Sequence, residues 1–196
     1  VMKQNTERLL NLTNQLLDFR KTESQGFRLN FAKCNITEVL KETHVRFTSL
    51  AKQKGLDFTL QVPEKDFYAH VNQEAFTKII SNLLNNGMKY AESYVHVMLE
   101  APQRDDNNLF RIRTVNDGVI IPDAMKEEIF KPFVRFNEQE DGKVTTGTGI
   151  GLALSRSLAE FHLGTLVMEA GEESNIFCLT LPVVQDTTIT LTPEAG

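Results

Sequence analysis

The 196-residue sequence contains no tryptophan, only two cysteines and no long run of apolar residues. Cys34 and Cys178 lie far apart and outside any CxxC or cysteine–histidine spacing, which excludes a disulfide scaffold and favours packed thiols in a reducing compartment. No apolar stretch approaches the roughly 20 residues that a membrane-spanning helix needs, and no signal-peptide pattern opens the sequence. We therefore expect no membrane contact from these residues.

Positive charge is also scarce, with 21 Lys and Arg against 26 Asp and Glu and a formal net charge of -5. No cluster of basic residues is present, and nucleic-acid surfaces need concentrated positive charge, so direct nucleic-acid contact is excluded. Any phosphate must be held by a local site. The hydrophobic and charged fractions, 41% and 24%, are those of a folded globular chain, and the length predicts one domain with an appendage.

The appendage is a predicted helix over residues 1–24, whose apolar positions recur at spacings of three and four. Leu10 and Leu17 make this stripe broader than a two-stranded coiled coil needs, which favours a helix bundle. We therefore expect this helix to dimerise or to have lost a neighbouring helix. The alternative is a terminal helix that lies on its own domain. The positions of the series are Met2, Asn5, Leu9, Leu12, Leu16 and Phe19.

The order of the remaining elements predicts an α+β sandwich and not a repeated βαβ unit. Asn35 and Asn72 are expected to cap two helices at their N-termini, and Gly55 to end the first of them. The predicted helices are 35–55, 72–91 and 150–162, and the predicted strands are 56–62, 67–71, 94–100, 109–115, 165–169 and 175–181.

The predicted helix at 72–91 has two neighbouring faces of different chemistry. One face is apolar, and the next presents Asn82, Asn86, Lys89 and Tyr90. Carboxamide oxygens suit a hard cation such as Mg²⁺, the lysine supplies positive charge, and the tyrosine offers a flat surface. Together they indicate a metal-bound polyphosphate beside an aromatic base, although a solvated polar face would look the same in isolation.

A second motif, GTGIGLAL at residues 147–154, places three alternating glycines directly before the last predicted helix. Glycine lets backbone N–H groups approach an anion, and a helix N-terminus adds partial positive charge. The motif indicates a phosphate-binding loop, with a structural turn as the alternative. It is not a dinucleotide-binding fingerprint, because it lies late in the chain and follows no strand of a βαβ unit.

Two further motifs lie between these, VNDGVIIP at 115–122 and IFKPFVRF at 129–136. Alone, the first could be a tight hairpin turn and the second a small apolar cluster. The order decides between these interpretations: a helix with asparagines, a turn with polar acceptors, an aromatic series, a polar stretch and a glycine loop follow one another.

In this order the motifs resemble the N, G1, F and G2 boxes of the ATP-binding catalytic domain of sensor histidine kinases, in the GHKL or Bergerat superfamily. The resemblance covers residues 1 to about 182. It implies a two-layer α/β sandwich with a mixed sheet on about three helices at 27–183, the second helix of a dimerisation and phosphotransfer bundle at 1–24, and the start of a linker at 184–196. The sequence QLLDFRKTE at 15–23 especially resembles hybrid two-component sensors.

The resemblance assigns roles residue by residue. Asn82 and Asn86 match the positions that hold Mg²⁺ and the phosphates, and Lys89 matches the phosphate-contacting lysine. Asn116 falls where the family has the aspartate that accepts from the adenine amino group, and Arg135 matches an arginine that reaches the γ-phosphate. Asn86, Lys89 and Arg135 are thus implied as catalytic. The implied ATP-binding set is Asn82, Asn86, Lys89, Tyr90, Asn116, Asp117, Gly118, Ile121, Phe133, Arg135, Gly147, Thr148, Gly149, Ile150, Gly151 and Leu152.

Two residues depart from the family pattern. Asn116 keeps an oxygen that can accept the adenine N–H but loses the charge, which costs about 1 kcal/mol, and Asp117 could replace it if the turn rotates. Ile120 stands at the usual second glycine and opposes close backbone approach to a nucleotide. These departures motivate one alternative, a docking module that binds nucleotide poorly.

The other alternative is an ATPase of the same superfamily. Gyrase-type, chaperone-type and mismatch-repair ATPases have a water-activating glutamate four residues before the essential asparagine, and here that position is Asn82. We therefore expect slow hydrolysis and transfer of the γ-phosphoryl group to another nucleophile. In the family this is a histidine followed by an acidic residue. The four histidines here precede valine or leucine, so they are expected to be structural or surface residues and the acceptor to lie upstream.

The resemblance thus implies a protein-histidine kinase that uses ATP and Mg²⁺ in two-component signal transduction. It implies a homodimer through the bundle helix and a receiver domain, in cis or in trans, as partners. It also implies that these residues are the cytoplasmic portion of a membrane-anchored sensor.

Overall fold

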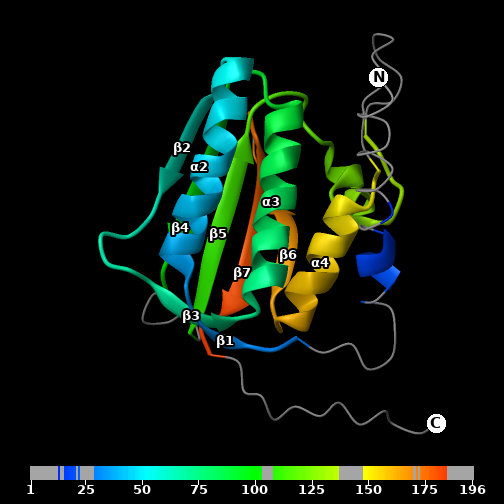
Figure 1. The fold of residues 1–196 in the computed structure, drawn as a ribbon. Coiled ribbons are helices and arrows are strands. Elements are labelled where there is room, and N and C mark those ends of the chain that lie inside the picture. The colour runs from blue at the N-terminus through cyan, green and yellow to red at the C-terminus, as the bar shows by residue number, and fades with distance from the viewer. Residues whose placement is uncertain are drawn as a thin grey trace, which may run out of the picture.

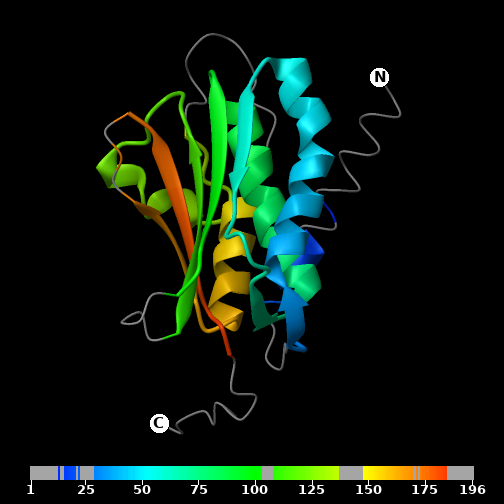
Figure 2. The ribbon, with the colours of Figure 1, turned by 90° about the vertical axis from the view of Figure 1, so that its left-hand side faces the viewer.

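The structure is a computed structural model that describes residues 13, 16–20, 22, 29–102, 108–136, 148–169, 171 and 173–184. These residues form two layers, a five-stranded sheet and a layer of helices on one of its faces (Figures 1 and 2). The helical layer consists of α2 (Ile36–Lys54), α3 (Gln73–Tyr90) and α4 (Gly151–Phe161). The predicted α+β sandwich is confirmed.

The main sheet is mixed, with strand order β2-β4-β5-β7-β6. β2 pairs with β4 in parallel, and all other neighbours are antiparallel. Alternate residues of β4 and β5 are buried against the helices, as expected for strands with one covered face. The strands are β2 (Asp57–Gln61), β4 (Tyr94–Glu100), β5 (Leu109–Asn116), β6 (Thr165–Glu169) and β7 (Asn175–Pro182).

A smaller antiparallel sheet pairs β1 (Ala32–Asn35) with β3 (Tyr68–Val71). After β5 the chain runs through two short 3₁₀ turns, η1 (Asp123–Met125) and η2 (Glu128–Phe130), before it reaches α4. Within the described ranges no helix combines the length and apolar character that crossing a bilayer requires.

Helix α3 is the central helix and the one that carries the candidate chemistry. It begins where predicted, because Asn72 Oδ1 accepts a hydrogen bond from the Ala75 backbone N–H at 2.9 Å. Its inner face is fully buried, with Phe76 and Leu83 at 0% exposure. Gly87 on this face lets β4 approach, because a Cβ atom there would lie 3.0 Å from a methyl carbon of Val95.

The described part of the N-terminal segment is helical at residues 13, 16–20 and 22. Leu16 and Phe19 pack against the domain core, and Asp18 forms a 2.6 Å ion pair with Lys78 of α3. Leu17 points outward, with 55% of its surface exposed. The segment thus contacts its own domain, and the rest of the predicted helix, like most of the predicted linker, lies outside the described residues.

His162 is the most enclosed of the four histidines. Its ring Nε2 accepts from the Asn72 N–H at 3.1 Å, so the ring proton resides on Nδ1, which donates to the Leu158 carbonyl oxygen at 2.7 Å. Burial lowers the pKa of His162 below its ordinary value because the charged imidazolium would lose its hydration. The imidazole is therefore held neutral.

This neutral histidine predicts a loss of folding stability in mild acid. The unfolded chain takes up the proton first, so the contribution of His162 to the free energy of unfolding should be constant above pH about 6.5 and fall below it, by at most about 1.4 kcal/mol per pH unit. Urea unfolding between pH 7.5 and 5.5 measures this. His162→Gln should be less stable throughout, but its stability should depend less on pH in this range. An unchanged slope in His162→Gln would contradict the assignment.

Candidate functional site

The sequence motifs meet around the C-terminal half of α3. The turn after β5 touches the end of the helix, because a Cβ atom on Gly118 would lie 2.2 Å from the carbonyl oxygen of Tyr90. The start of α4 touches the middle of the helix, because Asn82 Nδ2 donates to the Gly151 carbonyl oxygen at 3.2 Å. Motifs that are far apart in the sequence are thus neighbours in space.

Asn82 connects α3 to α4. Besides the bond to Gly151, its Nδ2 donates to Ser155 Oγ, also at 3.2 Å. The carbonyl oxygen of Asn82 makes no hydrogen bond with the part of the chain that the structure describes. The side chain therefore holds the first turn of α4 with its nitrogen and keeps an oxygen for a ligand.

Asn86 lies one turn further along α3 and is half-buried. No residue among those described hydrogen-bonds to its side chain. The same residues contain no group of three or more His, Cys, Asp and Glu side chains that could hold a metal ion by themselves. A cation here would be held by one or two carboxamide oxygens together with ligand oxygens, which is the usual way that Mg²⁺ binds with phosphates.

Lys89 and Tyr90 end α3 and lie against each other. The Lys89 ammonium donates to the Tyr90 hydroxyl at 2.6 Å and stands 4.3 Å from the centroid of the ring. Tyr90 is 41% exposed, so its ring presents an apolar surface beside a positive charge. An aromatic base linked to phosphates offers the complementary pair of features.

Asp117 lies just beyond the end of β5 and holds the loop between α3 and β4. Its carboxylate accepts from the backbone N–H groups of Glu92, Ser93 and Tyr94 at 2.9–3.0 Å and from the Ser93 hydroxyl. Burial, the largest cause, raises the pKa, but the hydrogen bonds together lower it to about 2. Both oxygens are committed to this loop, which corrects the expectation that Asp117 could replace Asn116 as a nucleotide acceptor.

Asn116 is the last residue of β5 and is 2% exposed. It stands in register with Asn175 on β7, a buried residue that sequence reasoning missed. Asn175 donates to the Val119 carbonyl oxygen and accepts from the Ile121 N–H, both at 3.0 Å. Asn175 therefore fixes the turn that follows Gly118. Ile121, predicted as a ligand residue, is half-buried and packs against the core.

The aromatic segment and the glycine loop are joined by one backbone contact. The Phe133 N–H donates to the Gly149 carbonyl oxygen at 2.8 Å. Gly149 has φ +69°, and a Cβ atom there would lie 2.8 Å from the Cα of Phe133, so only glycine fits. Phe133 is 65% exposed, and Arg135, two residues further on, is exposed as well.

The other predicted residues of the glycine loop differ in their structural roles. Thr148 Oγ1 accepts from the Ile150 N–H at 3.3 Å, which shapes the entry to α4. Ile150 is fully buried and Leu152 packs against the core, so these two side chains are structural. Gly147 lies outside the described residues.

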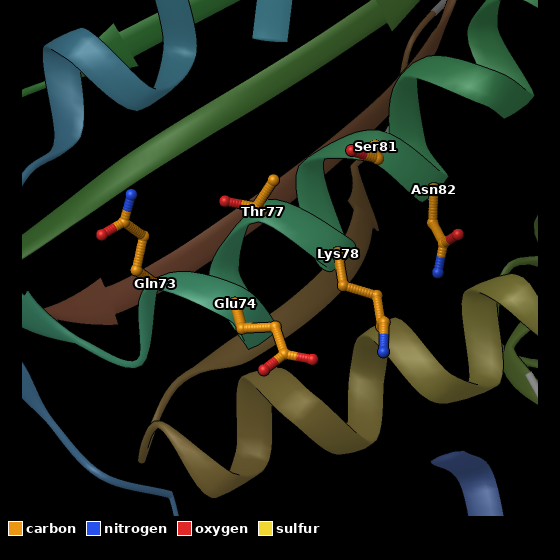
Figure 3. A pocket seen from close by; sticks show the side chains of 6 residues that line it. All are labelled: Gln73, Glu74, Thr77, Lys78, Ser81 and Asn82. Carbon is orange, nitrogen blue, oxygen red and sulfur yellow. The ribbon is translucent and has the colours of Figure 1, made fainter. Parts of the chain in front are cut away.

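A separate open hollow of about 610 Å³ runs along the N-terminal half of α3. Figure 3 shows Glu74, Lys78 and Asn82 on the side of α3 that points toward α4. The hollow meets the motif cluster only at Asn82, and none of the residues that line it is aromatic or aliphatic. The candidate site is therefore the motif cluster. The hollow is lined by Gln73, Glu74, Thr77, Lys78, Ser81 and Asn82.

Histidine kinases are among the known proteins of similar sequence. "Sensor histidine kinase WalK" of Bacillus subtilis is 26% identical over 95% of this chain and 30% of its own length. "Histidine kinase P4" of Formosa agariphila is 30% identical over 93% of this chain and 13% of its own. The chain thus spans less than a third of the length of these two relatives.

Solved structures share the fold. The nucleotide-free catalytic domain of histidine kinase ThkA superposes with a TM-score of 0.69 at 23% identity, over 80% of this chain and 97% of that one. Full-length ShkA in complex with AMPPNP superposes with a TM-score of 0.77 at 20% identity, over 91% of this chain and 36% of that one.

The family assignment comes from the sequence model that spans α3, the turn after β5 and the glycine loop. The model described as "Histidine kinase-, DNA gyrase B-, and HSP90-like ATPase" matches residues 71–194, more than half of the chain. With the motifs gathered around α3 and the fold shared with histidine kinase catalytic domains, the chain belongs to the family of histidine kinase-, DNA gyrase B- and HSP90-like ATPases.

Proposed function

We propose that this chain is the ATP-binding catalytic part of a protein-histidine kinase, which binds MgATP and supplies its γ-phosphoryl group to a histidine in two-component signal transduction. The observation that carries the proposal is that α3 holds the half-buried Asn86 and the Lys89–Tyr90 pair, while the turn after Asn116 contacts the end of this helix and the start of α4 contacts its middle. The histidine kinases among its relatives support the reaction class.

The residues present fit a magnesium-bound triphosphate. Asn86 offers a carboxamide without a partner among the described residues, and Asn82 offers its carbonyl oxygen. Bound Mg²⁺ would neutralise phosphate charge at these oxygens. Lys89 supplies positive charge at the end of the same helix, and Arg135, beyond the Phe133–Gly149 contact, would meet the γ-phosphate.

Asn82 also favours transfer of the γ-phosphoryl group over hydrolysis of ATP. It occupies the place of the water-activating glutamate, and a carboxamide cannot accept a proton at neutral pH. Its nitrogen is already bonded to Gly151 and Ser155 of α4. A water molecule beside the γ-phosphate would lack a general base, so a better nucleophile such as an imidazole is favoured.

The proposed partners follow from the same assignment. A receiver domain, in cis or in trans, would take the phosphoryl group from the histidine, and ThkA has been solved in complex with the response regulator TrrA. A homodimer would form through the helix that carries Leu17, whose side chain is 55% exposed. The full protein would be a membrane-anchored sensor with these residues in the cytoplasm.

Calorimetric titration of the 196-residue chain with MgATP tests the proposal. We expect saturable binding that needs Mg²⁺ and almost no steady phosphate release. No binding at millimolar nucleotide would overturn the proposal and support a docking module, for which Ile120, 37% exposed on the turn, is the motivating residue. Sustained phosphate release from the isolated chain would instead support a superfamily ATPase.

A further inference from the structure

The orientation of the Asn116 carboxamide is fixed by its neighbour. Asn116 Nδ2 donates to the backbone carbonyl oxygen of Asp117 at 2.6 Å. A carbonyl oxygen can only accept, so the reverse orientation of the amide would bring two oxygens to that distance. Asn116 Oδ1 has no hydrogen-bond partner in the described chain. It is not one of the side-chain atoms that are both fully buried and without a partner, so a ligand can reach it. The atom left for a ligand is therefore an acceptor.

This orientation matters because an asparagine can face a base in either sense. Adenine presents an amino donor at the position where guanine presents a carbonyl acceptor. A carboxamide that rotates freely can accept from the first or donate to the second, whereas a carboxylate can only accept. An asparagine in this place discriminates between the bases only if something prevents its rotation.

The Asp117 side chain holds the carbonyl oxygen that orients Asn116. Three backbone N–H groups and one hydroxyl of residues 92–94 converge on the carboxylate, which anchors residue 117 to the loop after α3. On the next residue, Gly118 packs directly on the Tyr90 carbonyl oxygen. The peptide group between Asp117 and Gly118, whose oxygen receives the Asn116 bond, is thus held from both sides.

We propose that Asp117 is a positioning residue that makes Asn116 an obligatory hydrogen-bond acceptor and thereby selects adenine over guanine nucleotides. The inference rests on the proposed nucleotide site and adds its base specificity. It assigns Asp117 a role without nucleotide contact and explains how this chain can use an uncharged asparagine for a task that a carboxylate performs by its chemistry alone.

The test compares the affinities of the 196-residue chain for MgATP and MgGTP by competition with a fluorescent nucleotide. The wild type should prefer ATP by about tenfold or more, the value of one hydrogen bond gained or lost in the site. Asp117→Ala frees the Asn116 amide, so the preference should fall to within about threefold. Asp123→Ala is the matched control, because Asp123 pairs with Lys126 on the surface, and it should keep the preference.

A double variant separates positioning from general damage. In Asn116→Asp with Asp117→Ala, residue 116 can only accept, so the preference for ATP should return although the loop remains unanchored. A purely structural role of Asp117 predicts no such rescue. If Asp117→Ala does not fold, Ser93→Ala, which removes only the hydroxyl donor, should lower the preference in the same direction.

The possible outcomes separate a failure of base selection from a failure of nucleotide binding. Equal binding of both nucleotides by the wild type would overturn the base-selection inference and leave the nucleotide site standing. A full preference in folded Asp117→Ala, or in Ser93→Ala where it takes its place, would overturn the inference in the same way. Binding of neither nucleotide would overturn the proposed function together with the inference.

Discussion

Replacing Asn86 with alanine should reduce the affinity for MgATP by about a hundredfold or more, which corresponds to about 3 kcal/mol. Asn86 is half-buried on α3, between Asn82, which bonds to the start of α4, and Tyr90, which the turn contacts. Its carboxamide makes no hydrogen bond with the described chain. The substitution therefore removes a ligand contact without breaking an internal hydrogen bond of those residues. Calorimetric titration with MgATP measures the loss.

The neighbouring residue supplies the control. Asn85 has the same side chain on the same helix but is exposed. Asn85→Ala should bind MgATP within about twofold of the wild type, because a surface substitution away from a ligand rarely exceeds about 0.5 kcal/mol. Alanine favours helix, so both variants should unfold at or above the wild-type temperature. Wild-type affinity in Asn86→Ala would remove Asn86 from the proposed site.

Asn82 cannot be tested as simply. Its nitrogen holds Gly151 and Ser155 at the start of α4, so Asn82→Ala would remove a proposed metal contact and an interhelical bond together. A loss of binding in that variant would not identify its cause. Asn86 is the better probe because its contribution is to the ligand alone among the described residues.

The helices and their chemical faces could be predicted because their determinants are local. The Asn72 cap and the apolar arc of α3 are encoded within a few residues, and the structure has both. The face that carries Asn86 follows from the same period. These local signals were sufficient to predict that an apolar face and a polar face lie side by side on one helix.

The roles of Asp117 and Asn175 depend on strand register, which local patterns do not determine. Antiparallel pairing places Asn116 opposite Val95, which brings the loop at 92–94 beside the Asp117 carboxylate. The pairing of β5 with β7 places Asn175 under the following turn. In the sequence, Asp117 reads as a turn residue and Asn175 as the start of a strand, so neither hydrogen-bond network could be derived.

Gly118 is required by the protein itself. The resemblance placed Gly118 in the implied ATP-binding set, and its close neighbour in the structure is the Tyr90 carbonyl oxygen. A Cβ atom would lie 2.2 Å from that oxygen. The residue also has φ +109°, a backbone conformation that is strongly unfavourable for every residue except glycine. Two separate penalties thus act at one position.

Gly118→Ala should therefore lower the free energy of unfolding by about 2–5 kcal/mol, the sum of backbone strain and a steric clash. The turn would have to move away from the end of α3, and MgATP affinity should fall with it because Asn116 and Tyr90 separate. Urea unfolding monitored by circular dichroism measures the first effect, and titration of the folded fraction measures the second.

Substitutions at two other glycines measure the backbone strain and the steric clash separately. Gly55 has φ +68° but nothing within 4 Å of the added carbon, so Gly55→Ala should show the backbone penalty alone, about 1 kcal/mol. Gly151 is helical, and the nearest atom lies 3.7 Å from the added carbon, so Gly151→Ala should be neutral or stabilising. If Gly118→Ala were no more destabilising than Gly55→Ala, the contact with Tyr90 would not hold the turn, and the anchoring of Asn116 would rest on the Asp117 carboxylate alone.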